Sequence, residues 1–310
     1  MNTLNALNPL FGANVDPSAA DPQEPFRRAQ IADQNGLHLI TLQDHPYNRQ
    51  FFDTWTLLTA LAMKTANVHI GTNVLSTPLR PPAMLSKMAA TLDILCQGRL
   101  ELGVGAGAYW PGIAAYGVDK RSPGGAVTAF EDALHILRGM WENAGGSFNY
   151  EGEFYQVNGA RPGPAPAHRI RIWTGAYGER MLDLTGRYAD GIFVTSTYLP
   201  PEGLVRSNRL IDAGAQKAGR DPAEIRRGYN LMGVLDLDRP DTRLDGDPDE
   251  GVFYGPVGYW VEEIVRLYRD YQQDTFIFWP NAGNEPVQIE AFAKQVVPAA
   301  SEAIQALHGG

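Results

Sequence analysis

Residues 37–45 read Leu-His-Leu-Ile-Thr-Leu-Gln-Asp-His, and they predict a buried strand that stops at two chemically active side chains. Gly36 separates this apolar run from the helical pattern before it. Pro46 ends the run, because proline disfavours helix at the preceding residue and has no N–H for a sheet. Asp44 and His45 are therefore expected at the C-terminal tip of a strand, where parallel α/β proteins bind ligands. The plainer alternative is an acid and an imidazole that only cap a turn.

The alternation of a strand with a helix recurs along the whole chain. Strands are predicted at 9–15, 37–45, 68–74, 99–104, 170–174, 191–195, within 225–237 and at 275–279, and helices at 24–35, 54–64, 83–97, 126–143, 179–188, 202–218, 258–271 and 285–307. Such alternation predicts a parallel sheet. Eight strand–helix units in 310 residues favour an α/β fold closed into a TIM (β/α)8 barrel over an open sheet.

Two segments interrupt this alternation. Residues 148–168 follow the fourth helix as an insertion, in which 148–157 alternate and predict a β-hairpin that turns at Glu151-Gly152. Residues 236–256 are predicted to form a polar loop after the seventh strand. We therefore expect one domain over residues 1–310, with an insertion and a long loop.

Composition limits the partners and the setting. The net charge of −9 argues against nucleic acid or an anionic membrane as a general partner, so a small molecule is the expected one. The single cysteine, Cys96, excludes an intramolecular disulfide and a multi-cysteine metal site, and its apolar surroundings predict a core position. No spacing of ligands predicts a metal. Residues 1–10 lack the features of a secretory signal, and no run approaches ~18 apolar residues, so a soluble, cytoplasmic protein is expected.

Two glycine segments follow predicted strands and are candidates for ligand contact. Residues 103–108, Gly-Val-Gly-Ala-Gly-Ala, fit a loose dinucleotide-binding pattern. They follow the fourth strand instead of the first, however, and Pro111-Gly112 are expected to prevent a helix from starting there. We interpret Gly105 and Gly107 as a loop in which missing side chains let a flat ligand lie close to the backbone. A simple tight turn is the alternative.

The second glycine segment, residues 175–178, joins the fifth strand to a helix. Free backbone N–H groups at a helix start bind phosphate, and Arg180 would add positive charge. The alternative is a glycine turn beside a solvated arginine. Tyr109, just after the first glycine segment, is either a core residue or part of an aromatic ligand site.

Taken in order, these segments resemble the bacterial luciferase-like flavin oxidoreductase superfamily. The resemblance covers roughly residues 10–195, and its motifs are Asp44-His45, Gly-Thr-Asn-Val-Leu at 71–75, the glycine-rich stretch at 98–107, Gly175-Ala176, and Gly-Arg-Tyr-Ala-Asp-Gly at 186–191. Within the superfamily, the first two motifs are most similar to the coenzyme F420-dependent branch. That branch includes F420-dependent glucose-6-phosphate dehydrogenase and methylene-tetrahydromethanopterin reductase.

The resemblance implies a TIM barrel, often a homodimer, with F420 or FMN at its C-terminal face. It matches His45 to the family's active-site histidine, the Asn73-Val74 bond to a non-prolyl cis peptide behind the cofactor ring, and residues 175–178 to the phosphate-binding region. The expected cofactor contacts are Asn14, Asp44, His45, Asn73, Val74, Gly105, Gly107, Tyr109, Gly175, Ala176, Tyr177, Gly178 and Arg180. The chain has Ala108 where dehydrogenases of this branch carry a glutamate, so sugar-phosphate dehydrogenase activity is not implied.

The function expected from these residues and this resemblance is hydride transfer between a cofactor and a small organic substrate. F420 is favoured over FMN, with His45 exchanging the substrate proton and Asp44 orienting the imidazole. One alternative is an FMN-dependent monooxygenase, in which reduced flavin meets oxygen. A second is a flavin-binding protein without turnover. A barrel hydrolase or lyase would need paired carboxylates or a metal at strand ends, which the sequence does not place.

Overall fold

Eight parallel strands close into a barrel in the computed structural model, which describes residues 8–238, 251–281 and 284–308. The barrel strands are β1 (Leu10–Asn14), β2 (Leu39–Leu42), β3 (His69–Thr72), β5 (Leu100–Gly105), β8 (Arg171–Gly175), β9 (Gly191–Thr195), β10 (Arg226–Leu235) and β12 (Thr275–Pro280). β1 pairs with both β2 and β12, and β9 pairs with both β8 and β10, so the ring is continuous. The predicted barrel is confirmed.

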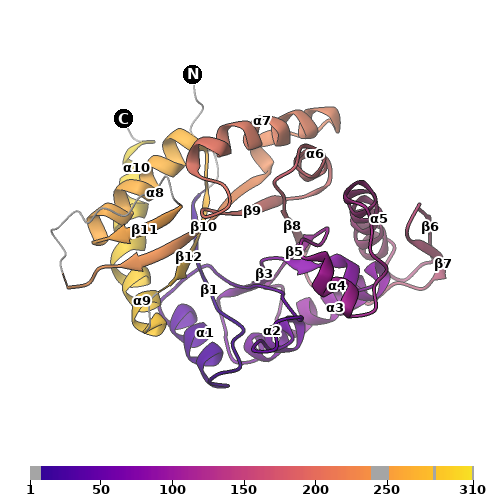
Figure 1. The fold of residues 1–310 in the computed structure, drawn as a ribbon, viewed down its shortest axis with the longest axis horizontal. Helices are drawn as coiled ribbons and strands as arrows, with labels where there is room; N and C mark the ends of the chain where they lie inside the picture. Colours follow the sequence, from indigo (N-terminus) through magenta and orange to yellow (C-terminus); the bar gives the residue numbers. More distant parts are fainter. Residues whose placement is uncertain (1–7, 239–250, 282–283, 309–310) are drawn as a thin grey trace.

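Helices cover the outside of the strands (Figure 1). They are α1 (Glu24–Gln34), α2 (Thr54–Ala62), α3 (Pro82–Leu95), α4 (Trp110–Ala115), α5 (Pro123–Glu142), α6 (Glu179–Tyr188), α7 (Pro201–Lys217), α8 (Val257–Tyr271), α9 (Glu285–Ala291) and α10 (Val297–Ala306), with 3-10 turns at Thr77–Leu79 and Pro222–Glu224. A π-helical turn, Phe292–Val296, joins α9 to α10, so the single helix predicted at 285–307 is divided. Pro298 has no N–H for a regular α-helical bond at this point. Within the described residues, no helix combines the length and apolar character needed to cross a membrane.

Helix α4 occupies a stretch in which the sequence predicted no helix. Pro111 lies in its first turn, where the missing N–H would have no partner inside the helix. Gly112 lies beneath the rings of Tyr47 and Tyr109, since a Cβ at this position would be 2.6 Å from an atom of each ring. The expectation that Pro111-Gly112 prevent a helix was therefore wrong, because proline is compatible with a first turn.

The loop predicted at 236–256 is in part a strand. β11 (Val252–Gly255) pairs in parallel with the C-terminal half of β10, and the short β4 (Leu75–Ser76) pairs with the end of β5. β10 has 10 residues and extends past the barrel, so its edge is available for this extra pairing. Residues 239–250 of the predicted loop lie outside the described residues.

The predicted hairpin insertion is present as β6 (Phe148–Glu151) and β7 (Gln156–Ala160), which pair antiparallel. It projects from the barrel next to α5 (Figure 1). Asp132 on α5 is buried and accepts hydrogen bonds from the Tyr150 hydroxyl at 2.9 Å and from the Phe154 N–H at 2.8 Å. The turn between the strands is therefore held on α5, and it is longer than the Glu151-Gly152 turn that was predicted.

The barrel interior contains a layer of four side chains, Leu39, Trp173, Phe193 and Ile277, each of which is buried. The rings of Trp173 and Phe193 are stacked, with centroids 4.3 Å apart and planes 7° from parallel. Such a layer fills the barrel as a packed core. It separates the two ends of the barrel, so a ligand at one end does not reach the other through the interior.

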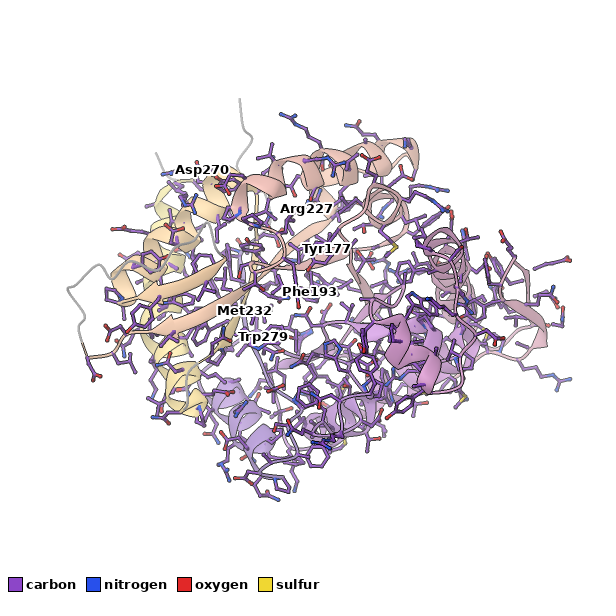
Figure 2. The ribbon with its side chains drawn as sticks, in the orientation of Figure 1. Tyr177, Phe193, Arg227, Met232, Asp270 and Trp279 are labelled. Atoms are coloured by element: carbon purple, nitrogen blue, oxygen red, sulfur yellow. The ribbon has the colours of Figure 1, made fainter. Side chains whose placement is uncertain are left out.

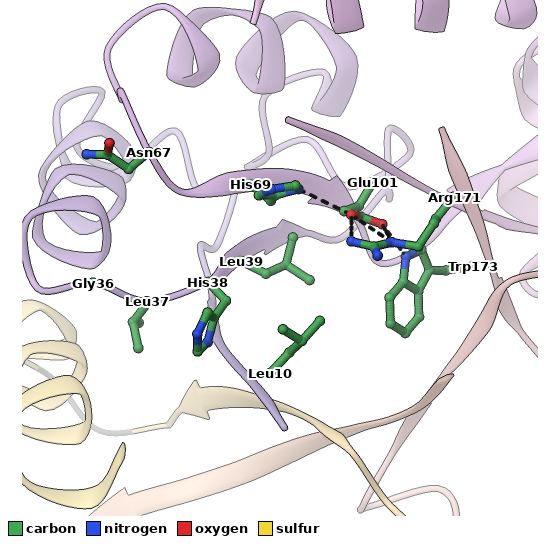
Figure 3. A pocket seen from close by; sticks show the side chains of 10 residues that line it. All are labelled: Leu10, Gly36, Leu37, His38, Leu39, Asn67, His69, Glu101, Arg171 and Trp173. Carbon is green, nitrogen blue, oxygen red and sulfur yellow. Dashed lines mark hydrogen bonds and ion pairs between the residues drawn. The ribbon is translucent and has the colours of Figure 1, made fainter. Parts of the chain in front are cut away.

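A charged cluster lies at the N-terminal end of the barrel, on the wall of a cavity of about 290 Å³ (Figure 3). Glu101 is 2% exposed and accepts hydrogen bonds from Trp173 Nε1 at 2.7 Å, from Arg171 Nε at 3.0 Å, and from His69 Nδ1 at 3.2 Å. Burial opposes ionisation of this carboxyl group, but the bonds from His69, Arg171 and Trp173 outweigh it and lower the pKa of Glu101 to about 2. This end of the barrel is opposite to the predicted ligand site, and polar groups there more often serve stability.

We predict that Glu101→Gln lowers the free energy of unfolding by about 1.5–3 kcal/mol at neutral pH, because it weakens the charge-assisted bonds from Arg171, whose side chain is 36% exposed and keeps part of its hydration. Urea denaturation measures this change. The folded-state pKa is depressed from 4.5, so the stabilisation is present above pH 4.5 and is lost as the pH falls toward 2. The difference between wild type and variant should shrink over that range, and a constant difference would contradict the assignment.

Candidate active site

The residues that the sequence singled out gather at the C-terminal ends of the barrel strands. His45 follows β2, which ends three residues earlier than predicted, Asn73 follows β3 directly, and Gly175 is the last residue of β8. Figure 2 shows Tyr177, from the next position after Ala176, and Trp279 of β12 near the middle of the view, inside the ring of helices. Segments far apart in the sequence therefore meet at one barrel opening.

The imidazole of His45 is hydrogen-bonded on one side. Its Nδ1 lies 2.8 Å from the hydroxyl of Tyr47. His45 is exposed, but the protein around the ring removes part of its hydration, and this lowers the pKa of His45 below its ordinary value. The negative charges of Asp44 and Asp16 offset only part of that effect. A largely neutral imidazole at pH 7 follows, with its second nitrogen available to a ligand.

Asp44 has a different role from the one predicted. Its carboxylate accepts a bidentate pair of bonds from Arg80, at 2.7 and 3.1 Å, and a third from the backbone N–H of Ser76 at 2.9 Å. These bonds direct the buried carboxylate toward the loop after β3 instead of toward His45. The prediction that Asp44 orients the imidazole is therefore corrected: Tyr47 bonds the ring, and Asp44 joins the loops after β2 and β3.

The Asn73–Val74 peptide bond is cis, as predicted. The Asn73 side chain reaches across the barrel, where its Nδ2 donates to Asn230 Oδ1 at 2.7 Å and approaches Thr41 Oγ1 at 3.3 Å. Asn230 in turn donates to Thr195 Oγ1 at 3.0 Å. Strands β2, β9 and β10 and the residue directly after β3 thus share one polar network. Asn230 and Thr195 were not among the predicted site residues, although a buried asparagine inside an apolar strand is a signal for such a network.

The side chain of Val74 lies inside the barrel near its C-terminal end. Its close approach explains why glycine occupies two of the predicted positions, 105 and 175. A Cβ on Gly105 would lie 2.9 Å from a methyl carbon of Val74, and a Cβ on Gly175 would lie 2.8 Å from it. Gly107 has a positive φ of 88°, and a Cβ there would be 2.8 Å from Ile113. At Gly105 and Gly107, the side on which a Cβ would project is therefore filled by protein side chains.

The turn from β8 to α6 is open where the sequence predicted phosphate binding. Gly178 caps α6 with extended backbone angles, φ −83° and ψ 151°, and a Cβ there would meet no atom within 4 Å. The first N–H groups of α6 have no partner within the helix. Arg180 turns away toward the start of α5, where it donates to the Gly124 carbonyl and the Thr128 hydroxyl, both at 3.3 Å. Arg180 is thus near this turn but not directed at it.

The remaining predicted contacts differ in exposure. Asn14 is buried, and its amide bridges the Thr41 carbonyl at 3.1 Å and Trp279 Nε1 at 3.2 Å. Ala176 is also buried. Tyr109 and Tyr177 are exposed at the opening, and the Tyr177 hydroxyl accepts from the Thr195 N–H at 3.2 Å.

Two hydroxyl groups next to the cis peptide were not predicted. Ser76 Oγ and Thr77 Oγ1 are buried, and neither has a hydrogen-bond partner among the described residues. A buried hydroxyl without a partner costs about 1–3 kcal/mol, so such groups call for a water or a ligand. Their place, directly after the segment at 71–75, adds them to the site. Only the fold reveals them, because serine and threonine are ordinary loop residues.

A closed parallel barrel with a histidine, a polar network and an open helix start at its C-terminal mouth is the arrangement of a barrel enzyme. The chain belongs to the luciferase-like monooxygenase family, whose model matches residues 5–242.

Two curated relatives and one solved structure show what the chain is similar to. A phthiodiolone/phenolphthiodiolone dimycocerosates ketoreductase from Mycobacterium sp. (strain JLS) is 34% identical over 61% of this chain and 50% of its own length. A 5,10-methylenetetrahydromethanopterin reductase from Methanolobus tindarius is 31% identical over 69% of this chain and 62% of its own length. The chain thus spans about half to three-fifths of these relatives.

The solved structure is an F420-dependent secondary alcohol dehydrogenase in complex with an F420-acetone adduct. It has a TM-score of 0.82 and 19% identity, covering 95% of this chain and 99% of that one. At this identity, the likeness shows the shared fold.

We predict that Asp44→Asn lowers the free energy of unfolding by about 1.5–3 kcal/mol, because it weakens charge-assisted bonds to Arg80 at a buried position. Asp53→Asn is the matched control: Asp53 is the other partner of Arg80, at 3.2 Å, and its side chain is 50% exposed. Asparagine also caps helices well, so the start of α2 is kept. Denaturant titration of both variants decides the point. Equal effects would mean that Asp44 is not the anchor.

Proposed function

We propose that the chain is an F420-dependent oxidoreductase that transfers a hydride between the deazaflavin and a small organic substrate. The observation that carries the proposal is the desolvated His45 at a barrel mouth that also has an open helix start and two unpartnered buried hydroxyl groups. The name of the structural neighbour, an F420-dependent alcohol dehydrogenase, supports this choice of cofactor. The names of the two relatives, a ketoreductase and a methylene-carrier reductase, support reduction or oxidation of a carbon centre.

The residues at the opening fit a cofactor with a phosphate and a polar ring edge. Residues 175–178 and the first turn of α6 would hold the phosphate, because a glycine cap with no neighbours leaves room for it and the helix start favours negative charge. Ser76 and Thr77 would supply hydroxyl partners for polar ring atoms. Such a cofactor, when bound, supplies the hydride donor or acceptor.

His45 would handle the proton that accompanies the hydride. A neutral imidazole accepts a proton from a substrate hydroxyl during oxidation, and the imidazolium returns it during reduction. The lowered pKa favours the neutral form near pH 7, and therefore the base. Asp44 and Arg80 would fix the loops on which His45 and Ser76 lie, without touching the reacting atoms.

An FMN-dependent monooxygenase is the second candidate, because the matched family model is described by that activity. Equilibrium binding of F420 compared with FMN distinguishes the two, followed by a test of which reduced or oxidised cofactor the protein turns over. Tighter FMN binding with oxygen consumption would replace the F420 proposal.

We predict that Gly178→Val weakens cofactor binding by about 10-fold or more, because its side chain would take the space left for the phosphate. The backbone angles at Gly178 are ones that valine adopts readily, so folding should be unaffected. Gly258→Val, at a second glycine whose Cβ would meet no atom within 4 Å, is the control on α8. Fluorescence titration with F420 measures affinity, and unchanged affinity would remove this turn from the site.

We predict that His45→Ala lowers turnover by about 10²–10⁴-fold, the usual range for a general acid or base. Cofactor affinity should change much less, since His45 is not needed for the phosphate or ring contacts. For substrate oxidation, the wild-type rate should rise with pH through a pKa below 6.5, and the variant should lose this limb. Single-turnover rates at saturating cofactor and substrate test this. A variant rate within a few-fold of wild type would end the proton-transfer role.

A further inference from the structure

The turn that carries His45 is held in place by helix α4. The Tyr116 hydroxyl at the end of α4 donates to the Pro46 carbonyl at 2.6 Å. At the other end of α4, the ring of Tyr47 packs closely on Gly112 and lies 5.1 Å from the ring of Tyr109. The two residues that follow His45 therefore both have partners on α4 or at its ends, and this short helix comes from the loop after β5.

The Tyr47 hydroxyl is hydrogen-bonded to Nδ1, one of the two ring nitrogens of His45. A hydroxyl can accept a bond from Nδ1–H or donate one to a bare Nδ1, so the 2.8 Å contact can persist in either tautomer and in the imidazolium. Burial, with help from Asp44 and Tyr109, raises the pKa of Tyr47, so the phenol keeps its proton at neutral pH. The Asp44 carboxylate is directed elsewhere, since its oxygens accept their bonds from Arg80 and Ser76.

We propose that Tyr47, clamped by α4, positions the imidazole of His45 so that Nε2 is the nitrogen that meets the substrate oxygen. This inference rests on the proposed function, in which His45 exchanges the substrate proton. During oxidation, the substrate O–H bond breaks and an Nε2–H bond forms. The carbon that bears this oxygen loses its hydride to the bound cofactor and becomes a carbonyl carbon. Reduction reverses each change. Tyr47 is a positioning residue, because it acts through His45.

The first test uses the cofactor-free protein and does not depend on activity. Side-chain nitrogen NMR resolves the 6 histidines, and His45→Ala identifies the His45 signals. Tyr47→Phe removes only the hydroxyl, so it should change the Nδ1 shift of His45 and move its titration midpoint. Tyr254→Phe, which removes the hydroxyl of an exposed tyrosine on β11, should leave both unchanged.

The second test is kinetic. Tyr47→Phe should lower kcat by about 10- to 100-fold, the cost of a misplaced catalytic group, while KM and cofactor affinity stay within about 3-fold. Gly112→Ala keeps the hydroxyl but displaces the Tyr47 ring, because the added Cβ would lie 2.6 Å from it, and should lower kcat in the same direction. Tyr254→Phe should keep the wild-type kcat.

The outcomes separate the two levels of the proposal. Wild-type nitrogen shifts in Tyr47→Phe overturn the inference, as does an unchanged kcat in an active enzyme. If the shifts change as expected but the wild-type protein turns over neither F420 nor FMN with any substrate, the proposed function fails while the bond between Tyr47 and His45 stands. Loss of cofactor affinity in Tyr47→Phe, with kcat preserved at saturation, would assign Tyr47 to cofactor binding instead.

Discussion

The packing of Val74 inside the barrel is the constraint on which the mouth of this protein depends. Its side chain extends the interior layer formed by Trp173 and Phe193, and glycines at 105 and 175 leave room for it. Next to it, Asn73 spans the barrel to Asn230. The strand ends around the opening are thereby fixed relative to one another. The apolar contact comes from Val74 and the polar network from Asn73, the residue before it.

Buried polar side chains lie at both ends of the barrel. At the N-terminal end, the Glu101 carboxylate is bonded by three neighbours, and nothing in that cluster needs a ligand. At the C-terminal end, Ser76 and Thr77 keep buried hydroxyls without partners among the described residues, and Gly178 leaves a helix start open. Buried polar groups are usually paired, so the two hydroxyls support the proposal that a ligand contributes at the C-terminal end.

Short sequence patterns were enough to predict the barrel, because each one reflects a local physical preference. The apolar runs that became β8 and β9 are buried on both faces, and the helical spacing in α5 and α6 is regular. The errors came where local rules compete. Pro111 was read as a helix breaker but is tolerated in the first turn of α4, and β11 forms only because β10 extends far enough to pair with it.

The sequence by itself determined the order of the elements, the strand-end position of His45 and the cis peptide at Asn73–Val74, because these follow from local patterns and from the family resemblance. Tertiary structure alone decided the hydrogen-bond partners of the side chains around the opening. Asp44 is adjacent to His45 in the chain, yet its charge is matched by Arg80, 36 residues away, while the imidazole is bonded by Tyr47. A carboxylate forms its bonds with whichever donors the fold brings within reach, and adjacency in sequence does not specify that direction.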